Sequence, residues 1–377
     1  MLIAVLVGVA LYGCGGKSSS KPDPAAVKAY ADRGYLADRH YETVETTDTW
    51  AVGLELVDVS LLTPSPPGSY PLVLYLPGLG ESAQAGGLWR QAWARAGYVV
   101  ISAQPAKYGT AEWASNRARA GEFYAIAKEA FAVPSLATRT QILADTLAEV
   151  VRRQKDGRTP ALAKVDLSRI AIAGYDLGAQ TAMVAAGESI RGVPAPKLAE
   201  GVKCVIALSP YADFSGMGTE SNFEPIRLPV LSVTSPVDTD AYGLTTSAAV
   251  RRAPFQYMPS GRKYLLLLSS SSHSVLAGAA PSAEQEGKIA AKGPSTDDAG
   301  IVGDETANPD DVGAQRKRRR ADSTRGDQSA RRVKEQTQVQ AVTTAYLDAV
   351  VKDDAVASEW LTRNAKHWLG ESELMSK

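Results

Sequence analysis

Short apolar runs, separated by polar and glycine-rich segments, recur along the chain and predict buried strands. The six densest runs are bounded by Pro, Gly or Ser and cover residues 70–78, 97–105, 169–176, 202–210, 228–236 and 263–273. Such runs are typical of strands buried on both faces of a parallel sheet. Ahead of them, residues 49–64 alternate apolar and polar positions, which predicts a half-buried antiparallel strand or hairpin.

Helical patterns lie between these runs, for example at residues 86–97 and 138–154. The alternation predicts an α/β fold with a mostly parallel, doubly wound sheet, helices on both faces and a leading antiparallel strand. We expect this domain to occupy residues 49–278. It follows an N-terminal segment, 14–48, in which residues 22–42 have a helical pattern.

The pattern changes at about residue 279. Residues 279–333 contain almost no large apolar side chains and are rich in charge, Gly, Pro and Ser, which predicts a disordered insertion. The basic run at 316–320 has acidic residues close on both sides, which favours a solvated segment over a contact with nucleic acid or anionic lipid. Residues 338–370 are again amphipathic, so 334–377 are expected to close the domain as a C-terminal helix.

Composition adds little to this picture. The 377 residues are 45% hydrophobic, with 41 Lys and Arg against 41 Asp and Glu. These values indicate a globular protein with a substantial core. Because the formal net charge is zero, no overall field favours nucleic acid or a membrane surface. A nucleic-acid partner is therefore not expected.

The N-terminus has the pattern of an exported protein. Its apolar stretch, about eleven residues long, is too short to span a bilayer and is typical of the core of a signal peptide. It ends in Leu-Tyr-Gly-Cys, which resembles a bacterial lipobox. This implies a signal peptide over 1–13 and a lipid anchor on Cys14 that holds the protein to a membrane of the bacterial cell envelope. The alternatives are a plain signal peptide and an uncleaved anchor. Cys204 lies in an apolar run and is expected to be a core residue without a disulfide partner.

The sequence AIAGYDLGAQTAM, residues 171–183, has the frame of a nucleophile elbow, G-x-S-x-G, with Asp176 at the central position. A sharp turn from strand to helix needs small flanking residues and lifts the central side chain above the sheet. It also aims the N–H of Leu177 at an oxyanion forming nearby. Alternatively, Asp176 only caps the helix that follows, because Asp is a favoured capping residue.

Two further elements end in residues suited to catalysis. Asp238 and Asp240 follow the run at 228–236, and His273 ends the run at 263–273. The carboxyl edge of a parallel sheet is where ligands bind, and the order elbow, acid, histidine is that of an esterase-type triad. The other histidines, His40 and His367, fall in predicted helices. His273 is therefore the candidate general base.

These features together resemble the α/β-hydrolase superfamily, and most closely its dienelactone-hydrolase-like and platelet-activating-factor-acetylhydrolase-like bacterial lipoproteins. The resemblance covers about residues 49–278 and the last helix. It is carried by GAQTAM after the elbow and by SPVDTDAYGL and RRAPFQYMP further on. It implies an α/β-hydrolase fold without a large cap, hydrolysis of carboxylic esters, and a small-molecule substrate.

The resemblance also implies roles for single residues. Asp176 stands at the nucleophile position, where most such enzymes have Ser, and His273 is the base. Asp238 is the triad acid and Asp240 the reserve candidate. The loop after the first long apolar run would supply a second oxyanion N–H, from Leu79, beside that of Leu177.

Cofactors and metals are not expected. Residues 78–83 match the dinucleotide pattern G-x-G-x-x-A, but the next strand ends in Ile-Ser-Ala-Gln-Pro, without an acidic residue to hold a ribose. His is scarce and there is no Cys pair, so no metal site is indicated. Residues 105–137 include aromatic side chains that either line the substrate pocket or pack the loop, namely Tyr108, Trp113, Phe123 and Tyr124.

An aspartate at the elbow leaves three interpretations. Attack on an ester carbonyl would mostly reverse, because a carboxylate leaves more readily than an alkoxide. Attack on a saturated carbon would give an alkyl ester of Asp176, as in haloalkane dehalogenases and epoxide hydrolases. Those families typically have Trp where this chain has Leu177, and the segment 211–227 is short for their helical cap. Thirdly, two carboxylates around His273 could form a non-catalytic network. Ester hydrolysis is the leading hypothesis.

Overall fold

The structure is a computed structural model that describes residues 34–213, 218–279 and 309–377. Side chains in the last range are described from residue 328. The predicted signal peptide at 1–13, the lipidation site Cys14 and most of the predicted N-terminal helix lie outside the described residues.

A nine-stranded sheet forms the centre of the fold, in the order β1-β2-β4-β3-β5-β6-β7-β8-β9. From β4 to β8 the neighbouring strands are parallel, whereas β1, β2 and β9 pair antiparallel. This confirms the predicted α/β class and a mostly parallel sheet. The strands are β1 (Thr43–Val52), β2 (Glu55–Pro64), β3 (Tyr70–Leu76), β4 (Val99–Pro105), β5 (Val165–Tyr175), β6 (Val202–Leu208), β7 (Val230–Thr234), β8 (Lys263–Leu267) and β9 (Glu373–Ser376).

Each of the six apolar runs forms a strand of the parallel part of the sheet, β3 to β8. Every residue of β3 is buried, as expected for a strand covered on both faces. Cys204 is fully buried in β6, as predicted. The predicted strand or hairpin at 49–64 is a hairpin of β1 and β2, turning at Gly53, where φ is 58°. Its first strand starts earlier than predicted, at Thr43.

The predicted helix at 22–42 is wrong where it can be checked, because residues 34–42 are not helical. Their tyrosine side chains pack against other elements instead of forming one face of a helix. Tyr35 is buried, with its ring 5.8 Å from that of Trp360, and the ring of Tyr41 lies 5.5 Å from that of Tyr70. His40 therefore lies in an extended N-terminal segment.

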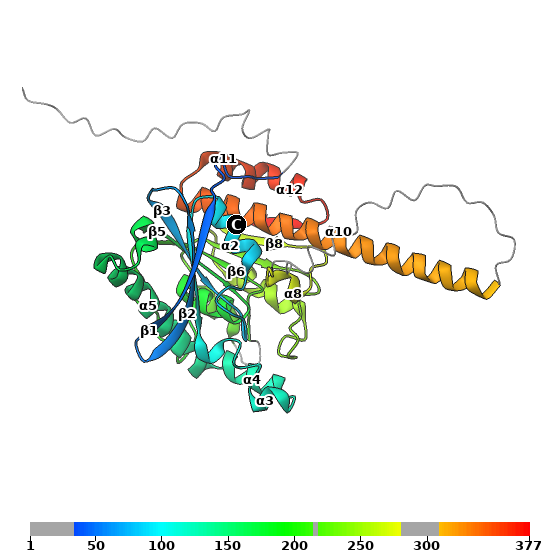
Figure 1. The fold of residues 1–377 in the computed structure, drawn as a ribbon, viewed down its shortest axis with the longest axis horizontal. Coiled ribbons are helices and arrows are strands. Elements are labelled where there is room, and N and C mark those ends of the chain that lie inside the picture. The colour runs from blue at the N-terminus through cyan, green and yellow to red at the C-terminus, as the bar shows by residue number, and fades with distance from the viewer. Residues whose placement is uncertain (1–33, 214–217, 280–308) are drawn as a thin grey trace, which may run out of the picture.

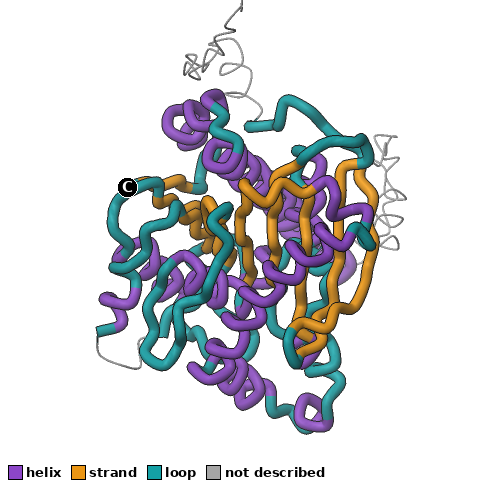
Figure 2. Tube along the Cα trace, turned by 90° about the vertical axis from the view of Figure 1, so that its left-hand side faces the viewer, coloured by secondary structure: helices purple, strands orange, loops and turns teal. Residues whose placement is uncertain are grey.

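Helices cover both faces of the sheet (Figures 1 and 2). On one face, α2 (Gly87–Arg95) and the C-terminal part of α10 (Pro309–Val351) enclose a core rich in tryptophan. On the other, α5 (Val133–Asp156) and α6 (Leu177–Ala186) pack over β3, β4 and β5. The shorter helices are α3 (Asn116–Arg119), α4 (Phe123–Phe131), α7 (Ala253–Tyr257), α8 (His273–Leu276), α11 (Ala355–Glu359) and α12 (Ala365–Trp368). Single 3₁₀ turns cover Ala106–Tyr108, Pro160–Lys164, Thr219–Asn222 and Ala248–Arg252, and a π turn covers Trp360–Asn364.

The disorder predicted for 279–333 does not hold for residues 309–333, which form the first part of α10. This stretch is continuous with the buried part of the helix and consists largely of good helix formers such as Arg, Lys, Gln and Ala. Figure 1 shows it projecting away from the sheet. The rest of the predicted insertion, 280–308, lies outside the described residues.

The predicted single closing helix over 334–377 is also wrong in part. Helix α10 ends at Val351, and the chain then turns through Asp353, where φ is 56°. Asp354 caps α11 by accepting the N–H groups of Val356 and Ala357. The chain ends in β9, a strand of four residues that adds to the edge of the sheet beside β8.

Candidate active site

The turn between β5 and α6 holds Asp176 in a strained conformation, with φ 51° and ψ −111°. Two glycines make this turn possible. A Cβ at Gly174 would lie 2.3 Å from the carbonyl oxygen of Gly178, and a Cβ at Gly178 would lie 2.0 Å from that of Leu76. Asp176 makes no side-chain capping bond to α6. Its side chain therefore makes its contacts outside α6.

That contact is with His273, at the start of α8. Asp176 Oδ1 lies 3.4 Å from His273 Nε2, and Asp176 Oδ2 accepts the backbone N–H of Leu79 at 3.5 Å. The Asp176 side chain is 2% exposed. The N–H of Leu79, which was predicted to bind a substrate oxyanion, thus contacts the Asp176 carboxylate in this structure. Leu177, the other predicted donor, is the first residue of α6, where N–H groups have no partner within the helix.

On its other side, the His273 ring contacts Asp238. His273 Nδ1 lies 2.8 Å from Asp238 Oδ1, and the Tyr175 hydroxyl donates a hydrogen bond to the His273 carbonyl oxygen. The structure therefore brings together Asp176, His273 and Asp238 from the ends of three different strands. The other histidines lie elsewhere, His40 in the N-terminal segment and His367 in α12.

Asp238 is fully buried, and both of its carboxylate oxygens accept hydrogen bonds. Ser209 Oγ lies 2.7 Å from each carboxylate oxygen, and the Thr234 hydroxyl donates to Oδ2 at 2.7 Å. Arg251 Nε lies 3.3 Å from Oδ1. Burial alone raises the pKa of Asp238, but the hydrogen bond from His273 and the charge of Arg251 outweigh it and hold the pKa below its usual range. The carboxylate is therefore kept charged beside the imidazole.

Asp240, the reserve candidate for the triad acid, contacts backbone N–H groups instead of His273. Its carboxylate accepts the backbone N–H groups of Tyr242, Leu244 and Thr245, and so shapes the loop after β7. These bonds lower its pKa although burial opposes them. No contact joins it to His273 among the described residues. Of the two candidates for the acid, Asp238 is therefore the one whose carboxylate contacts His273 among the described residues.

The imidazole between these carboxylates binds its proton tightly. Burial by itself lowers the pKa of His273, but the hydrogen bonds that the ring donates to Asp176 and Asp238 raise it to about 9. At neutral pH the ring is therefore an imidazolium. It becomes a general base only after one of the two negative charges has been removed or the pH has been raised.

Aromatic side chains cover the loop that carries Leu79. Trp113 packs directly on Gly80, where a Cβ would overlap its ring, and it stacks on Tyr242 with ring centroids 5.4 Å apart. The carbonyl of Tyr108, which is buried, accepts the N–H of Gly80 at 2.8 Å. Of the four predicted aromatic residues, Phe123 and Tyr124 are exposed. The segment 105–137 thus packs the loop at one end and presents rings to solvent at the other.

Glu81 is a further acidic group beside the site. Its Oε2 accepts the N–H of Gly78 at 2.8 Å. Burial raises its pKa to about 7, with a contribution from the nearby charge of Asp176. Glu81, Ser209, Thr234 and Arg251 were not predicted as site residues. Glu81 follows β3, Ser209 follows β6 and Thr234 ends β7, so only these three have positions that could have pointed to them. Arg251 lies in the turn Ala248–Arg252, which adjoins no strand.

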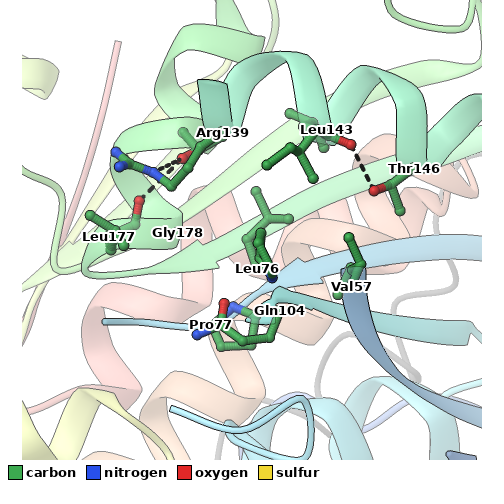
Figure 3. A pocket seen from close by; sticks show the side chains of 13 residues that line it. Val57, Leu76, Pro77, Gln104, Arg139, Leu143, Thr146, Leu177 and Gly178 are labelled. Carbon is green, nitrogen blue, oxygen red and sulfur yellow. Dashed lines mark hydrogen bonds between the residues drawn. The ribbon is translucent and has the colours of Figure 1, made fainter. Parts of the chain in front are cut away.

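A small cavity lies behind the turn, between β3, α5 and the start of α6 (Figure 3). Leu76, Pro77, Arg139, Leu177 and Gly178 are among its lining residues. Its volume of about 20 Å³ holds about one water molecule. It is therefore too small to be a substrate pocket.

Comparisons with known proteins add no assignment. Neither the models of protein families nor the curated proteins gave a match to this chain. Among the helices of the described residues, none is long and apolar enough to cross a membrane. In the same part of the chain, no group of three or more His, Cys, Asp or Glu side chains is placed to hold a metal ion.

Proposed function

We propose that this protein is a hydrolase with the α/β-hydrolase fold, in which Asp176 replaces the usual serine as the nucleophile. The observation that carries the proposal is the array Asp176–His273–Asp238, with contacts of 3.4 and 2.8 Å on a strained turn. The supporting features are the order of elbow, acid and histidine after β5, β7 and β8 and the N–H of Leu79 facing the carboxylate.

Carboxylic esters are the substrates that the sequence resemblance favours. Attack of Asp176 on an ester carbonyl would form a tetrahedral intermediate held by the N–H groups of Leu79 and Leu177. The intermediate goes forward, to a mixed anhydride, only when the leaving group is a weak base that competes with the carboxylate. Aryl esters activated by electron-withdrawing groups come closest to this requirement, whereas simple alkyl esters do not meet it.

A saturated carbon bearing a leaving group is the second candidate, and the charge state of His273 favours it. A carboxylate oxygen of Asp176 attacks the carbon, the bond to the leaving group breaks, and an alkyl ester forms. Asp176 then no longer carries the charge that raises the pKa of His273. The imidazolium then releases its proton to solvent, and the neutral ring becomes a base.

The second half of that reaction regenerates the enzyme. Neutral His273 takes a proton from water, and the hydroxide attacks the carbonyl carbon of the Asp176 ester. The C–O bond to the alkoxide breaks, and the imidazolium returns a proton to the alkoxide, giving an alcohol. The Asp176 carboxylic acid left by the attack then passes its proton to the ring, which restores the carboxylate and the imidazolium. Asp238, bonded to Nδ1, stabilises the imidazolium formed in this step.

We further propose that the protein acts at the bacterial cell envelope, anchored through a lipid on Cys14. This rests on the resemblance of residues 11–14 to a lipobox. The residues after Cys14 are Gly-Gly-Lys-Ser-Ser-Ser, a composition typical of a flexible tether.

The experiment compares p-nitrophenyl butyrate, 1-bromobutane and 1,2-epoxybutane as substrates of the native protein, Asp176→Asn and Asp176→Ser. We expect the native protein to turn over at least one of them and Asp176→Asn to be slower by about 100-fold or more. The class that is cleaved decides between the two candidates.

Loss of catalysis is the outcome that would overturn the proposal. Asp176 is nearly fully buried, and its ion pair with His273 would then serve only to stabilise the fold. In that case the native protein cleaves none of the three compounds. Ester cleavage by Asp176→Ser alone would show that the rest of the site is intact, and that the native aspartate has ended an ester-hydrolysing function.

A further inference from the structure

A cavity of about 330 Å³ lies apart from the triad, between the end of α4, the start of α5, α6 and the segments that follow α6 and β6. None of Asp176, Asp238 and His273 lines it. Its volume is at the lower end of the range for ligand pockets, so it suits a small molecule or one end of a larger one.

Among the lining residues that the structure describes, Glu188 has a buried carboxylate oxygen without a hydrogen-bond partner. The residue is 7% exposed, and its Oε2 atom is buried without a hydrogen-bond partner. Such a group costs free energy, and native proteins rarely leave one unpaired. The backbone around it is fixed, because the N–H of Glu188 donates to Met183 and that of Ser189 donates to Asn222. The carboxyl group is therefore held at the cavity wall.

The other polar groups of the lining do not satisfy Glu188. Gln180 is occupied, since its Nε2 donates to the Phe131 carbonyl at 3.1 Å and its Oε1 accepts from Arg139. Arg191 and Asp213 are exposed. Burial is the cause that raises the pKa of Glu188 to about 8, so neither charge compensates it.

Thr219 and Asn222 add a hydroxyl and an amide group to the lining, and most of the other lining residues that the structure describes are apolar. Phe131 and Leu136 are buried, and Tyr211 contacts Phe131 with ring centroids 4.7 Å apart. A ligand that complements this lining has a positively charged hydrogen-bond donor that pairs with Glu188. The donor is joined to a short hydrocarbon chain that packs on the apolar residues. The aromatic rings also favour a cation over an anion.

We propose that this cavity is a binding site for a primary alkylammonium group, whose N–H groups donate to the Glu188 carboxylate while its alkyl chain packs on Phe131, Leu136 and Tyr211. The site goes beyond the proposed hydrolase function and does not depend on it, because binding can be measured without turnover. A charge-assisted bond to a buried carboxylate is of the stronger kind.

The test is calorimetric titration of the full chain with n-butylammonium, with 1-butanol and n-butyrate as comparison ligands. The native protein is expected to bind n-butylammonium more tightly than either of them. Glu188→Gln, which keeps the shape and removes the charge, is expected to weaken binding by about tenfold or more. Glu200→Gln makes the same change at an exposed position of the same connection and is expected to bind as the native protein does.

The pH dependence gives a second readout. Because the charged form of Glu188 is populated above about pH 8, affinity is expected to rise about tenfold between pH 7 and pH 9. Tyr211 does not interfere, since burial raises its pKa to about 12. n-Butylammonium, a primary amine like the side chain of Lys, keeps its charge in this range.

Three results would overturn the proposal. The first is no measurable binding of n-butylammonium to the native protein. The second is equal affinity for 1-butanol and n-butylammonium, which would indicate a neutral hydroxyl ligand. The third is an unchanged affinity in Glu188→Gln. Circular dichroism and melting of both variants establish that they are folded, so that a loss of binding in Glu188→Gln alone reports on the cavity.

Discussion

His273 Nε2 lies 3.4 Å from Asp176 Oδ1, while Nδ1 of the same ring contacts Asp238 at 2.8 Å. The ring therefore lies between two carboxylates, one on the turn after β5 and one on the loop after β7. With a serine at position 176, the ring would instead face a hydroxyl group that it could deprotonate. The aspartate thus changes the resting state of the site from a neutral base to an imidazolium.

The first prediction concerns the pKa of His273. Proton NMR of the three histidines as a function of pH should give one with an apparent pKa of about 9. In Asp176→Asn the ring loses one of its two carboxylate partners, so its pKa should fall by one unit or more. An unchanged value in this variant would mean that the charge of Asp176 does not act on the ring.

A second prediction follows for stability. The pKa of His273 is raised on folding, from an unfolded value of about 6.5 to about 9. The protonated ring therefore stabilises the fold fully below pH 6.5, and this contribution is lost as the pH rises to 9. The loss should be about 3 kcal/mol.

The measurement is urea unfolding of the native protein and His273→Gln at pH 6.5 and pH 9. The native protein should lose more free energy of unfolding between these pH values than the variant does. Glu188, whose pKa is also raised, contributes equally to both proteins and cancels in the comparison. Equal losses in the two proteins would contradict the prediction.

A third prediction concerns the turn itself. Gly178→Ala places a Cβ 2.0 Å from the backbone oxygen of Leu76, which cannot move without displacing β3. This should lower the free energy of unfolding by about 3 kcal/mol or more. Gly121→Ala is the matched control, because φ is +83° there but nothing lies within 4 Å of the new Cβ. It should cost only about 1 kcal/mol.

A fourth prediction concerns Glu335 of α10, which holds the serine run before His273. Its carboxylate is 3% exposed and accepts hydrogen bonds from the N–H of Ser270 at 2.8 Å and from the hydroxyls of Ser269 and Ser271. In Glu335→Gln the loop should loosen, and kcat on a turned-over substrate should fall about tenfold with KM unchanged.

The pKa of His273 separates this positioning role from a general loss of stability. In Glu335→Gln it should fall toward 6.5, because the ring moves relative to its carboxylate partners. The exposed Glu371→Gln should leave both kcat and the pKa at their native values. If Glu335→Gln melts earlier but keeps the native kcat and pKa, Glu335 is only structural.

The sequence predicts the sheet well because each central strand is a short apolar run with β-breaking ends. It fails where side-chain pattern carries no such signal. Strand β9 has only four residues, two of them half-buried, and forms because the chain returns to the edge of β8. The helix at 309–333 has few apolar residues and depends on its continuity with the buried end of α10.

The residues of the candidate site likewise include some that the sequence predicts and some that it does not. Asp176, Asp238 and His273 were predictable because each follows a strand and belongs to a known order of elements. Ser209, at a φ of 58°, and Arg251 could not be predicted, since their role depends on distances between loops that sequence spacing does not give. The choice of Asp238 over Asp240 likewise needed the backbone bonds that occupy Asp240.

The most direct measurement is mass spectrometry of the Asp176 peptide after many turnovers in ¹⁸O-labelled water. If Asp176 is the nucleophile, each turnover passes through a covalent intermediate on its carboxylate. Water attacks the aspartyl carbonyl in every turnover when this intermediate is an alkyl ester, and in a share of turnovers when it is a mixed anhydride. Heavy oxygen should therefore appear in the Asp176 carboxylate, while the Asp238 peptide and a sample without substrate stay unlabelled. Turnover that leaves Asp176 unlabelled would contradict a covalent role and show that water attacks the substrate directly.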